Sequence, residues 1–561
     1  MDGISIPMSW VGLGVFLIMF LCMWYFMPKR SRDPLLPNEE VGHLAGLTRD
    51  ALEDLALEAT KWKCGVCAFH NSKDKTTCQL CKTAQAVYIL EAPELFQTME
   101  GTLRPEQLSL DQQSARLRHQ WKLNVIGNTW KWQATMPIDS SSTYYVATAK
   151  PQWSLLPMAR ANVNFTLCGE ILPLWWHSLL DQMRQQPFSL KYARLVSYIA
   201  ATYTGHTKFN VARHTVLNQS LTAITDLQPS ELCTLTTITL EGESGIDAGG
   251  IMREWYTILV LAIFEPKQGL FVANKADQSF SINPNSKKAH GPRHLEKFHS
   301  IGRLLGRAIV DGQVLPFHFS IPLFKMLLGY PVSMDDIQYI DSTVYSSLKF
   351  IQGAADVDSL TLTFSVSVDA STEVDLIPNG RNVAVTNANK ADYVDRMVRY
   401  LLFDSAAPQL ESLVQGLYEV LPPELLMAFD YKELELVLCG FSEIDVADWK
   451  RCTNVSRSLE SIVEWFWEIV ENEMTSVQRE RLLQFTTGSS RVPLQGFKGL
   501  TSQDGRLCPF SLHGMSYKEG ILPRVQSCFN RINMPIYPTK ELMREGIFAL
   551  VNIESMIFTL V

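Results

Sequence analysis

One cysteine lies in a polar loop near the C-terminal end of the sequence, in the run Leu522-Pro523-Arg524-Val525-Gln526-Ser527-Cys528-Phe529-Asn530. A single free cysteine is usually a small buried hydrophobic residue, so its type alone does not make it a nucleophile. The reactive form is the thiolate, and a free thiol with a pKa of about 8.5 is only partly ionised near neutral pH. Arg524 and Arg531 flank Cys528 and would raise the ionised fraction, although they also fit ordinary surface charge. Cys528 is therefore a candidate nucleophile whose role depends on the rest of the sequence.

Length and composition indicate several folded units rather than one. The chain has 561 residues, of which 46% are hydrophobic and 19% charged, and this length suits about two to four domains. The net charge of −8 argues against nucleic acid as the main partner, because phosphate backbones bind basic surfaces. Of the 11 cysteines, four cluster within residues 64–81. This distribution predicts a metal site and reduced thiols rather than a disulfide framework.

An apolar run opens the sequence and predicts a transmembrane anchor over residues 8–27. Residues 10–27 carry no charge, at the lower limit of the roughly 20 residues that a spanning helix needs. The basic cluster at residues 29–32 follows, so the positive-inside rule predicts a single-pass membrane protein with its C-terminal bulk in the cytosol. A short span suits the endoplasmic reticulum or another intracellular membrane. A cleaved signal peptide or a buried helix is the alternative, and residues 28–57 are predicted to be a linker.

Two CxxC pairs predict a structural zinc site. The pairs are Cys64 with Cys67, and Cys78 with Cys81. Four thiolates at this spacing suit tetrahedral Zn²⁺, and a segment too short to bury a core needs metal bonds for its stability. A redox CxxC motif or chance pairing is the alternative.

Residues 58–86 also match a wider pattern, W-x-C-x2-C-x3-N-x6-C-x2-C, which includes Trp62 and Asn71. This pattern resembles the Ran-binding-protein type (NZF-like) zinc finger, whose members bind ubiquitin or single-stranded RNA. The resemblance implies that Phe69 and Leu80 contact ubiquitin, because they match two of the three positions that ubiquitin binders use. At the third position, the ubiquitin binders have a threonine and this sequence has Ala68. The finger loop 68–77 contains no arginine, which favours ubiquitin over RNA.

A second motif lies in the C-terminal two-thirds of the chain. The glycine-rich turn and helix start that form it are Gly245-Ile246-Asp247-Ala248-Gly249-Gly250 and Arg253-Glu254-Trp255. A phosphate-binding loop is excluded because no Gly-Lys-Ser/Thr follows. Together with the cysteine loop, this motif resembles the HECT-type ubiquitin ligases, and the resemblance runs from residue 188 to residue 561. The cysteine loop keeps five family positions and departs at Gln526 and Ser527, where the family has His and Thr.

The resemblance implies an α+β fold with two lobes. It places a larger, mainly helical N-lobe at 188–439, a hinge at 440–443 and a smaller α/β C-lobe at 444–561. The surface that docks a ubiquitin-conjugating enzyme is expected within 315–405. The complete predicted fold class is thus an N-terminal transmembrane helix, a small zinc-ribbon finger and a bilobal HECT domain, with a connector of unknown function at 87–187.

The resemblance also implies a reaction. Cys528 would accept ubiquitin from a conjugating enzyme as a glycyl thioester and pass it to lysines of protein substrates. Ser527 would support this step by keeping a hydroxyl at the family's threonine position. Phe558 would help to position the loaded C-lobe. Zn²⁺ would be structural only, and the predicted enzyme would be anchored in a membrane by its N-terminal helix.

A different class of function stays open. The chain would then be a non-catalytic membrane adaptor that binds ubiquitin through a degenerate HECT fold, and Gln526 is the residue that favours this alternative. Retention of Cys528 and Phe558 argues against it. An RNA-binding role is disfavoured by the acidic net charge.

Overall fold

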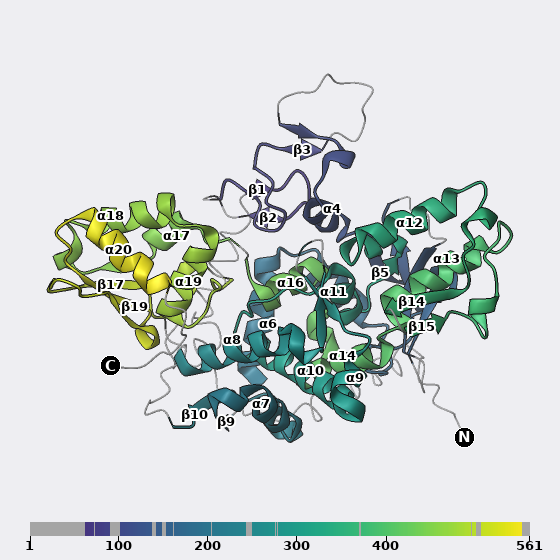
Figure 1. Cartoon of the computed structure of the whole chain (residues 1–561), viewed down its shortest axis with the longest axis horizontal. Helices are drawn as coiled ribbons and strands as arrows, with labels where there is room; N and C mark the ends of the chain where they lie inside the picture. Colours follow the sequence, from purple (N-terminus) through teal and green to yellow (C-terminus); the bar gives the residue numbers. More distant parts are fainter. Residues whose placement is uncertain are drawn as a thin grey trace, which may run out of the picture.

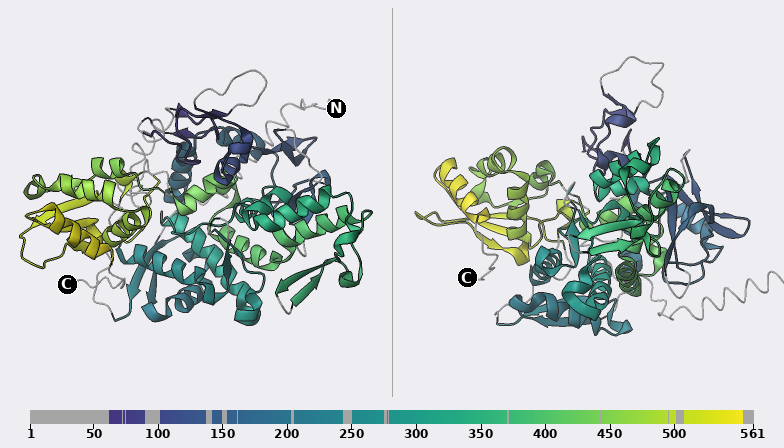
Figure 2. Two further views of the ribbon diagram at one scale, coloured as in Figure 1. Left: turned by 45° about the horizontal axis from the view of Figure 1, so that its top comes forward. Right: turned by 45° about the vertical axis from the view of Figure 1, so that its right-hand side comes forward.

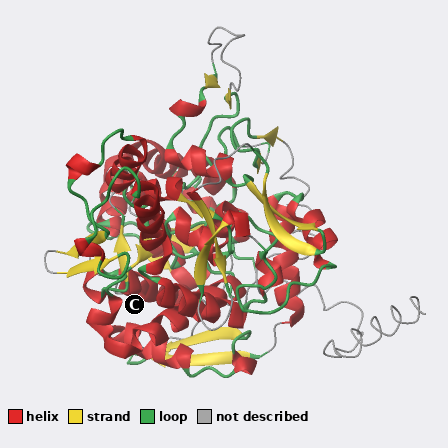
Figure 3. Ribbon diagram, turned by 90° about the vertical axis from the view of Figure 1, so that its right-hand side faces the viewer, coloured by secondary structure: helices red, strands yellow, loops and turns green. Residues whose placement is uncertain are grey.

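The computed structural model describes residues 62–552 except 72, 74, 90–100, 137–141, 149–152, 161, 203–204, 243–249, 275–276, 278, 370–371, 442, 495 and 501–506. Helices dominate this part of the chain, and its strands form several small, separate sheets (Figure 3).

The predictions of a membrane-spanning helix and of a single-pass membrane location are wrong by this structure. No helix in its described part is long and apolar enough to cross a membrane. The longest, α10 (His294–Val310), has 17 residues and includes acidic and basic side chains, whereas a spanning helix needs about 20 mostly apolar residues. The predicted span 8–27 and the linker 28–57 lie outside the described residues. The corrected fold class is a mixed α/β domain preceded by a four-cysteine cluster.

The finger and the connector consist mainly of short strands. Their elements are β1 (Trp62–Lys63), β2 (His70–Asn71), β3 (Tyr88–Ile89), β4 (Thr102–Leu103), α4 (Leu110–Leu117), β5 (Trp121–Ile126), β6 (Thr129–Ala134), β7 (Thr143–Ala147), β8 (Ser154–Pro157) and α5 (Trp176–Arg184). β1 pairs antiparallel with β2, and β5 pairs antiparallel with β6.

The large lobe is mainly helical. Its helices are α6 (Phe188–Thr202), α7 (Val216–Thr225), α8 (Gly250–Phe264), α9 (Ser286–His290), α10, α11 (Ile321–Leu327), α12 (Ser342–Gly353), α13 (Lys390–Arg399), α14 (Ala407–Val420), α15 (Pro423–Leu426) and α16 (Tyr431–Cys439). Its strands are β9 (His206–Val211), β10 (Leu235–Leu240), β11 (Phe271–Ala273), β12 (Phe280–Ile282), β13 (Val332–Ser333), β14 (Ser365–Asp369) and β15 (Thr372–Asp375). Figure 1 shows α10 and α14 side by side in its centre.

The connector is part of the large lobe rather than a separate linker. Its strand β7 is the middle strand of a three-stranded sheet between β8 and β13. Tyr144 of β7 is buried, and its hydroxyl donates a 2.5 Å hydrogen bond to Asp395 Oδ1. The finger, the connector and the large lobe therefore share one continuous hydrophobic core.

The small lobe has a core of its own. Its elements are α17 (Val446–Arg451), β16 (Asn454–Val455), α18 (Val463–Glu468), α19 (Ser476–Thr487), β17 (Ser511–Met515), β18 (Arg524–Gln526), β19 (Arg531–Pro535) and α20 (Lys540–Val551). The sheet order is β16-β17-β19-β18, with only the β18–β19 pair antiparallel. The first core reaches Cys439 and the second begins at Trp449, so the core changes across a segment that includes residues 440–443. Figure 2 shows the small lobe at one side of the large lobe.

The crossing of α10 and α14 depends on two glycines. A Cβ atom on Gly416 would lie 2.0 Å from the carbonyl oxygen of His299, and one on Gly302 would lie 2.0 Å from that of Leu413. Both contacts are with backbone atoms, which cannot rotate away. The helices can pack this closely only because neither position carries a side chain.

We expect Gly416→Ala to lower the free energy of unfolding by about 3 kcal/mol or more, because the added methyl group forces the two helices apart. The matched control is Gly353→Ala in α12, where a Cβ meets nothing within 4 Å. That change should be neutral or stabilise the protein by up to about 1 kcal/mol. Urea unfolding of both variants measures the difference, and equal effects would contradict the close approach.

Candidate functional site

Four buried cysteines form a cluster in the finger with the geometry to hold a metal ion. The sulfur atoms of Cys64, Cys67, Cys78 and Cys81 all lie within 4.8 Å of one another. The Cys64–Cys81 and Cys67–Cys78 sulfur pairs are each 3.6 Å apart, and none of the four cysteines forms a disulfide. The sequence spacing places one pair in each of two turns. Four buried thiols around one point fit a tetrahedral metal ion.

Asn71 and Trp62 brace the cluster. Asn71 is buried; its side-chain amide donates to the Phe69 carbonyl at 3.1 Å, and its Oδ1 accepts from the Gln79 backbone N–H at 2.9 Å. Asn71 thus links the two cysteine turns. The Trp62 indole N–H donates to the Lys75 carbonyl at 2.9 Å. These bonds hold the turns in place from outside the cluster.

Phe69 and Leu80, the two residues expected to contact ubiquitin, are both buried. Their exposed fractions are 3% and 7%. The Phe69 ring lies 6.1 Å from that of Phe188 on α6, and the Arg118 guanidinium lies 5.7 Å from its centroid. The large lobe and the connector thus cover the Phe69 side chain, through Phe188 and Arg118 respectively.

The predicted nucleophile lies in a tight turn between two strands. Cys528 is the middle residue of the 3₁₀ helix η15 (Ser527–Phe529), which joins β18 to β19. The strands pair up to Gln526 and Arg531, so the turn is fixed closely on both sides. Phe529 is 52% exposed, and the Arg531 guanidinium lies 5.7 Å from its ring centroid.

Asn530 holds the end of this turn. It adopts the left-handed conformation with φ 47° and ψ 45°, which asparagine tolerates better than most residues. Its side chain is fully buried and donates a 2.7 Å hydrogen bond to the Cys508 carbonyl. The short polar side chain therefore fixes the backbone immediately after η15.

The large lobe contacts the same turn through α8. Arg253 donates from Nη2 to the Ser527 carbonyl at 3.3 Å, and Thr257 Oγ1 donates to the Gly488 carbonyl at 3.2 Å. The sequence pointed to Arg253 only as part of a motif. No spacing signal could connect residues 253 and 527, because the contact crosses between the lobes.

Two other cysteines are unsuited to nucleophilic chemistry. Burial raises the pKa of the Cys439 thiol well above its ordinary value, and it also raises the pKa of Cys452. Both therefore stay protonated near neutral pH. Phe558 lies outside the described residues.

Comparison with known proteins identifies the family. The model for the HECT-domain (ubiquitin-transferase) matches residues 257–560, more than half of the chain. This chain belongs to the HECT-domain family. Residues 188–256, which the sequence resemblance includes, lie before the matched region.

Several curated relatives of this HECT protein are E3 ubiquitin-protein ligases. The chain is 39% identical over 318 residues to ptr1 of Schizosaccharomyces pombe, covering 55% of this chain and 10% of that protein. It is 39% identical over 321 residues to TOM1 of Saccharomyces cerevisiae, covering 56% of this chain and 10% of that protein. It is 34% identical over 425 residues to Smurf1 of Drosophila melanogaster, covering 73% and 38% respectively. The chain thus spans about a tenth to two-fifths of the length of these relatives.

We expect Asn530→Ala to destabilise the small lobe by about 2–4 kcal/mol, because it loses a buried hydrogen bond and strains a left-handed residue. Asn530→Gly loses the same bond without the strain and should cost about 1–2 kcal/mol less. Urea unfolding followed by the fluorescence of the small-lobe tryptophans measures both. An equal cost for the two variants would show that the left-handed conformation contributes nothing.

Proposed function

We propose that this HECT protein is a ubiquitin ligase that carries ubiquitin as a thioester on Cys528. Membership of the HECT family supports the class of reaction. The observation that carries the residue assignment is the position of Cys528 at the centre of η15, in a turn held by Asn530 and contacted by Arg253. Ubiquitin, a conjugating enzyme and lysine-bearing protein substrates are the proposed partners.

The proposed reaction has two steps. The Cys528 thiolate attacks the thioester carbonyl that joins ubiquitin to the conjugating enzyme, and the enzyme's cysteine leaves as a thiolate. A neutral substrate lysine then attacks the Cys528 thioester, forms an isopeptide bond and releases the Cys528 thiolate together with one proton from the amine. The first step exchanges one thioester for another, so it needs an accessible thiolate rather than a strongly activated one.

The proposed domain roles follow the sequence limits. Residues 188–439 would form the N-lobe, with the conjugating-enzyme surface within 315–405. Residues 440–443 would be the hinge, and 444–561 the C-lobe with Ser527 and Phe558 in supporting roles. A hinge of this kind would let the C-lobe move between conjugating enzyme and substrate.

We expect Cys528→Ala to abolish a reductant-sensitive ubiquitin adduct when the chain is incubated with activating enzyme, a panel of conjugating enzymes, ubiquitin and ATP. Cys528→Ser should instead trap an adduct that resists reductant, because an oxyester replaces the thioester. Gels with and without reductant measure both outcomes, and Cys452→Ser is the matched control. The absence of any adduct with the unmodified chain would favour the non-catalytic ubiquitin-binding adaptor.

We also propose that the finger is of the Ran-binding-protein type and that its metal is structural Zn²⁺. Thiolates at 2.3 Å from a tetrahedral Zn²⁺ lie about 3.8 Å apart, close to the 3.6 Å sulfur separations of the cluster. The Asn71 bonds that link the two turns support the same type. Contact of Phe69 and Leu80 with ubiquitin is proposed only for a finger that has left the large lobe, because both are buried here.

We expect about one zinc per chain, and Cys78→Ser should reduce the zinc content and destabilise the finger because metal bonds supply its folding energy. Elemental analysis of the purified protein, with and without a strong chelator, measures this. The control is Cys168→Ser, since Cys168 is an exposed cysteine outside the cluster. Unchanged zinc content in the Cys78 variant would contradict the assignment.

A further inference from the structure

The finger contacts the chain on both sides of the segment that joins the lobes. On the large-lobe side, Cys67 offers its backbone carbonyl to Arg118 Nε at 3.3 Å. Arg118 follows α4 and is 4% exposed, and its Nη1 donates to Asp430 at 2.5 Å and to Glu433 at 3.4 Å. Lys191 of α6 completes the group with a 2.8 Å bond to Glu433. All four charged side chains are buried.

These carboxylates belong to the last helix of the large lobe. Asp430 is the N-cap of α16 and accepts hydrogen bonds from the backbone N–H groups of Lys432 and Glu433. Burial opposes its charge, but Arg118 holds the pKa of Asp430 below its ordinary value. The N-terminus of α16 is thus tied to the finger through Arg118. The C-terminus of α16 leads directly into Gly440.

On the small-lobe side, the finger contacts the first helix after that segment. Lys75 Nζ forms an ion pair with Asp445 Oδ2. Asp445 is the N-cap of α17 and accepts from the Asp448 backbone N–H at 2.9 Å through its other oxygen. The finger thus contacts the N-cap of α17 directly and the N-cap of α16 through Arg118, one on each side of residues 440–443. Figure 1 shows β1 and β2 above α16, on the side toward α17.

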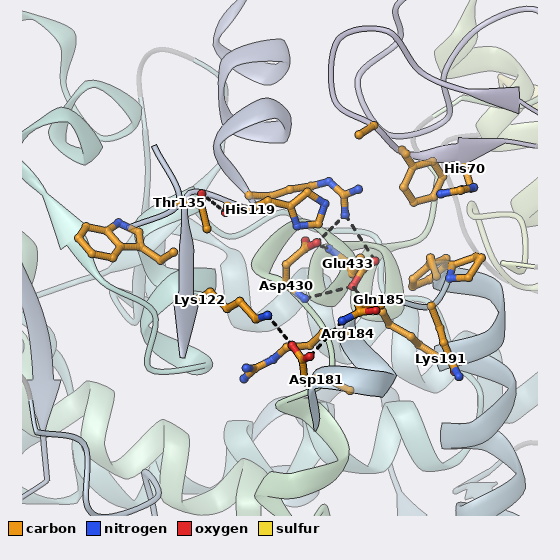
Figure 4. Close-up of a pocket in the computed structure, with 18 of the residues that line it drawn as sticks. His70, His119, Lys122, Thr135, Asp181, Arg184, Gln185, Lys191, Asp430 and Glu433 are labelled. Carbon is orange, nitrogen blue, oxygen red and sulfur yellow. Dashed lines mark hydrogen bonds and ion pairs between the residues drawn. The ribbon is translucent and has the colours of Figure 1, made fainter. Parts of the chain in front are cut away.

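The same finger face lines one side of a cavity of about 350 Å³. Figure 4 shows this cavity, with His70 from the finger, His119 and Asp181 from the connector, and Lys191 and Glu433 from the large lobe around it. Phe69 lines it together with Phe188. Three separate parts of the chain therefore meet here, and the finger covers a surface that is both apolar and charged.

We propose that the finger is an intramolecular clamp whose partner is this chain's own large lobe, and that Lys75 positions the small lobe by pairing with Asp445. The buried Arg118 network and the Phe69 contact fix the finger on the large lobe. Lys75 of the finger then contacts Asp445 of the small lobe. This positioning role does not depend on the ligase reaction, so it can be tested without measuring ubiquitin transfer.

The two contacts of the finger, one with the large lobe and one with the small lobe, differ in strength. The buried charge network, whose loss is strongly destabilising, fixes Arg118 on α16. The finger is held against this fixed group by the Cys67 carbonyl bond and by the buried Phe69 ring. The Lys75–Asp445 ion pair is partly buried, with side chains 16% and 38% exposed, and a single pair that still contacts water shifts an equilibrium by about two- to fivefold. The small lobe is therefore biased toward one orientation and can still leave it.

The first test detects the contact in the full chain. A carbodiimide joins an amine to a carboxylate without a spacer, so the docked state should give a peptide in which Lys75 is linked to Asp445. Mass spectrometry identifies this peptide. Its absence from the unmodified protein would overturn the proposal.

The second test measures the consequence by limited chymotrypsin cleavage after Phe441, whose rate follows the population of open molecules when reclosing is fast. Lys75→Gln and Asp445→Asn should each raise the rate about two- to fivefold, and asparagine keeps the cap of α17. The double variant should show no further increase, because both changes remove the same ion pair. Lys73→Gln, at an exposed lysine of the same finger, should leave the rate unchanged.

Two outcomes would overturn the clamp. One is that the two single effects multiply in the double variant, since independent sites do not share an ion pair. The other is that excess free ubiquitin raises the cleavage rate of the full chain and that Phe69→Ala, with its zinc content retained, abolishes this effect. That result would mean that the finger face takes ubiquitin rather than the large lobe. Loss of ligase activity alone decides neither outcome.

Discussion

The buried guanidinium of Arg118 is the interaction on which the arrangement of the other parts depends. It joins a carbonyl of the finger to two carboxylates of α16, and it also lies against the Phe69 ring. A charge buried this deeply is tolerated only with its partners, and loss of one partner typically costs about 3–5 kcal/mol. The finger, the connector and the large lobe thus form one structural unit.

The local features of this protein were accessible from sequence because they depend on spacing alone. The two CxxC pairs predicted four thiols around one point, and the structure brings their sulfur atoms together. The cysteine loop and the helix start at Arg253 likewise indicated the HECT family, and the comparisons confirm it. The assignment of Cys528 as the nucleophile stays a prediction, as does the position of the hinge.

The long-range features were not accessible from sequence. Arg118 and Asp430 are separated by 312 positions. β7 pairs with β13 across 188 positions, from Tyr144 to Val332. No sequence periodicity indicates such a pairing, so the sequence left the function of the connector unknown. Phe69 matched a ubiquitin-binding pattern, but sequence alone gave no indication that Phe188 would cover it. The apolar run 8–27 gave a membrane prediction that no helix of the described structure supports.

The partners in the Arg118 network are synthesised at different times. A ribosome adds about 5–20 residues per second, so the 312 positions between Arg118 and Asp430 correspond to a delay of about 15–60 s. During that time the finger and the connector have already emerged, while α16 does not yet exist. Their cationic and aromatic surface stays exposed to solvent until α16 has been synthesised. A nascent chain of this protein therefore exposes this surface for about 15–60 s before its partner is made, which gives chaperones time to bind it.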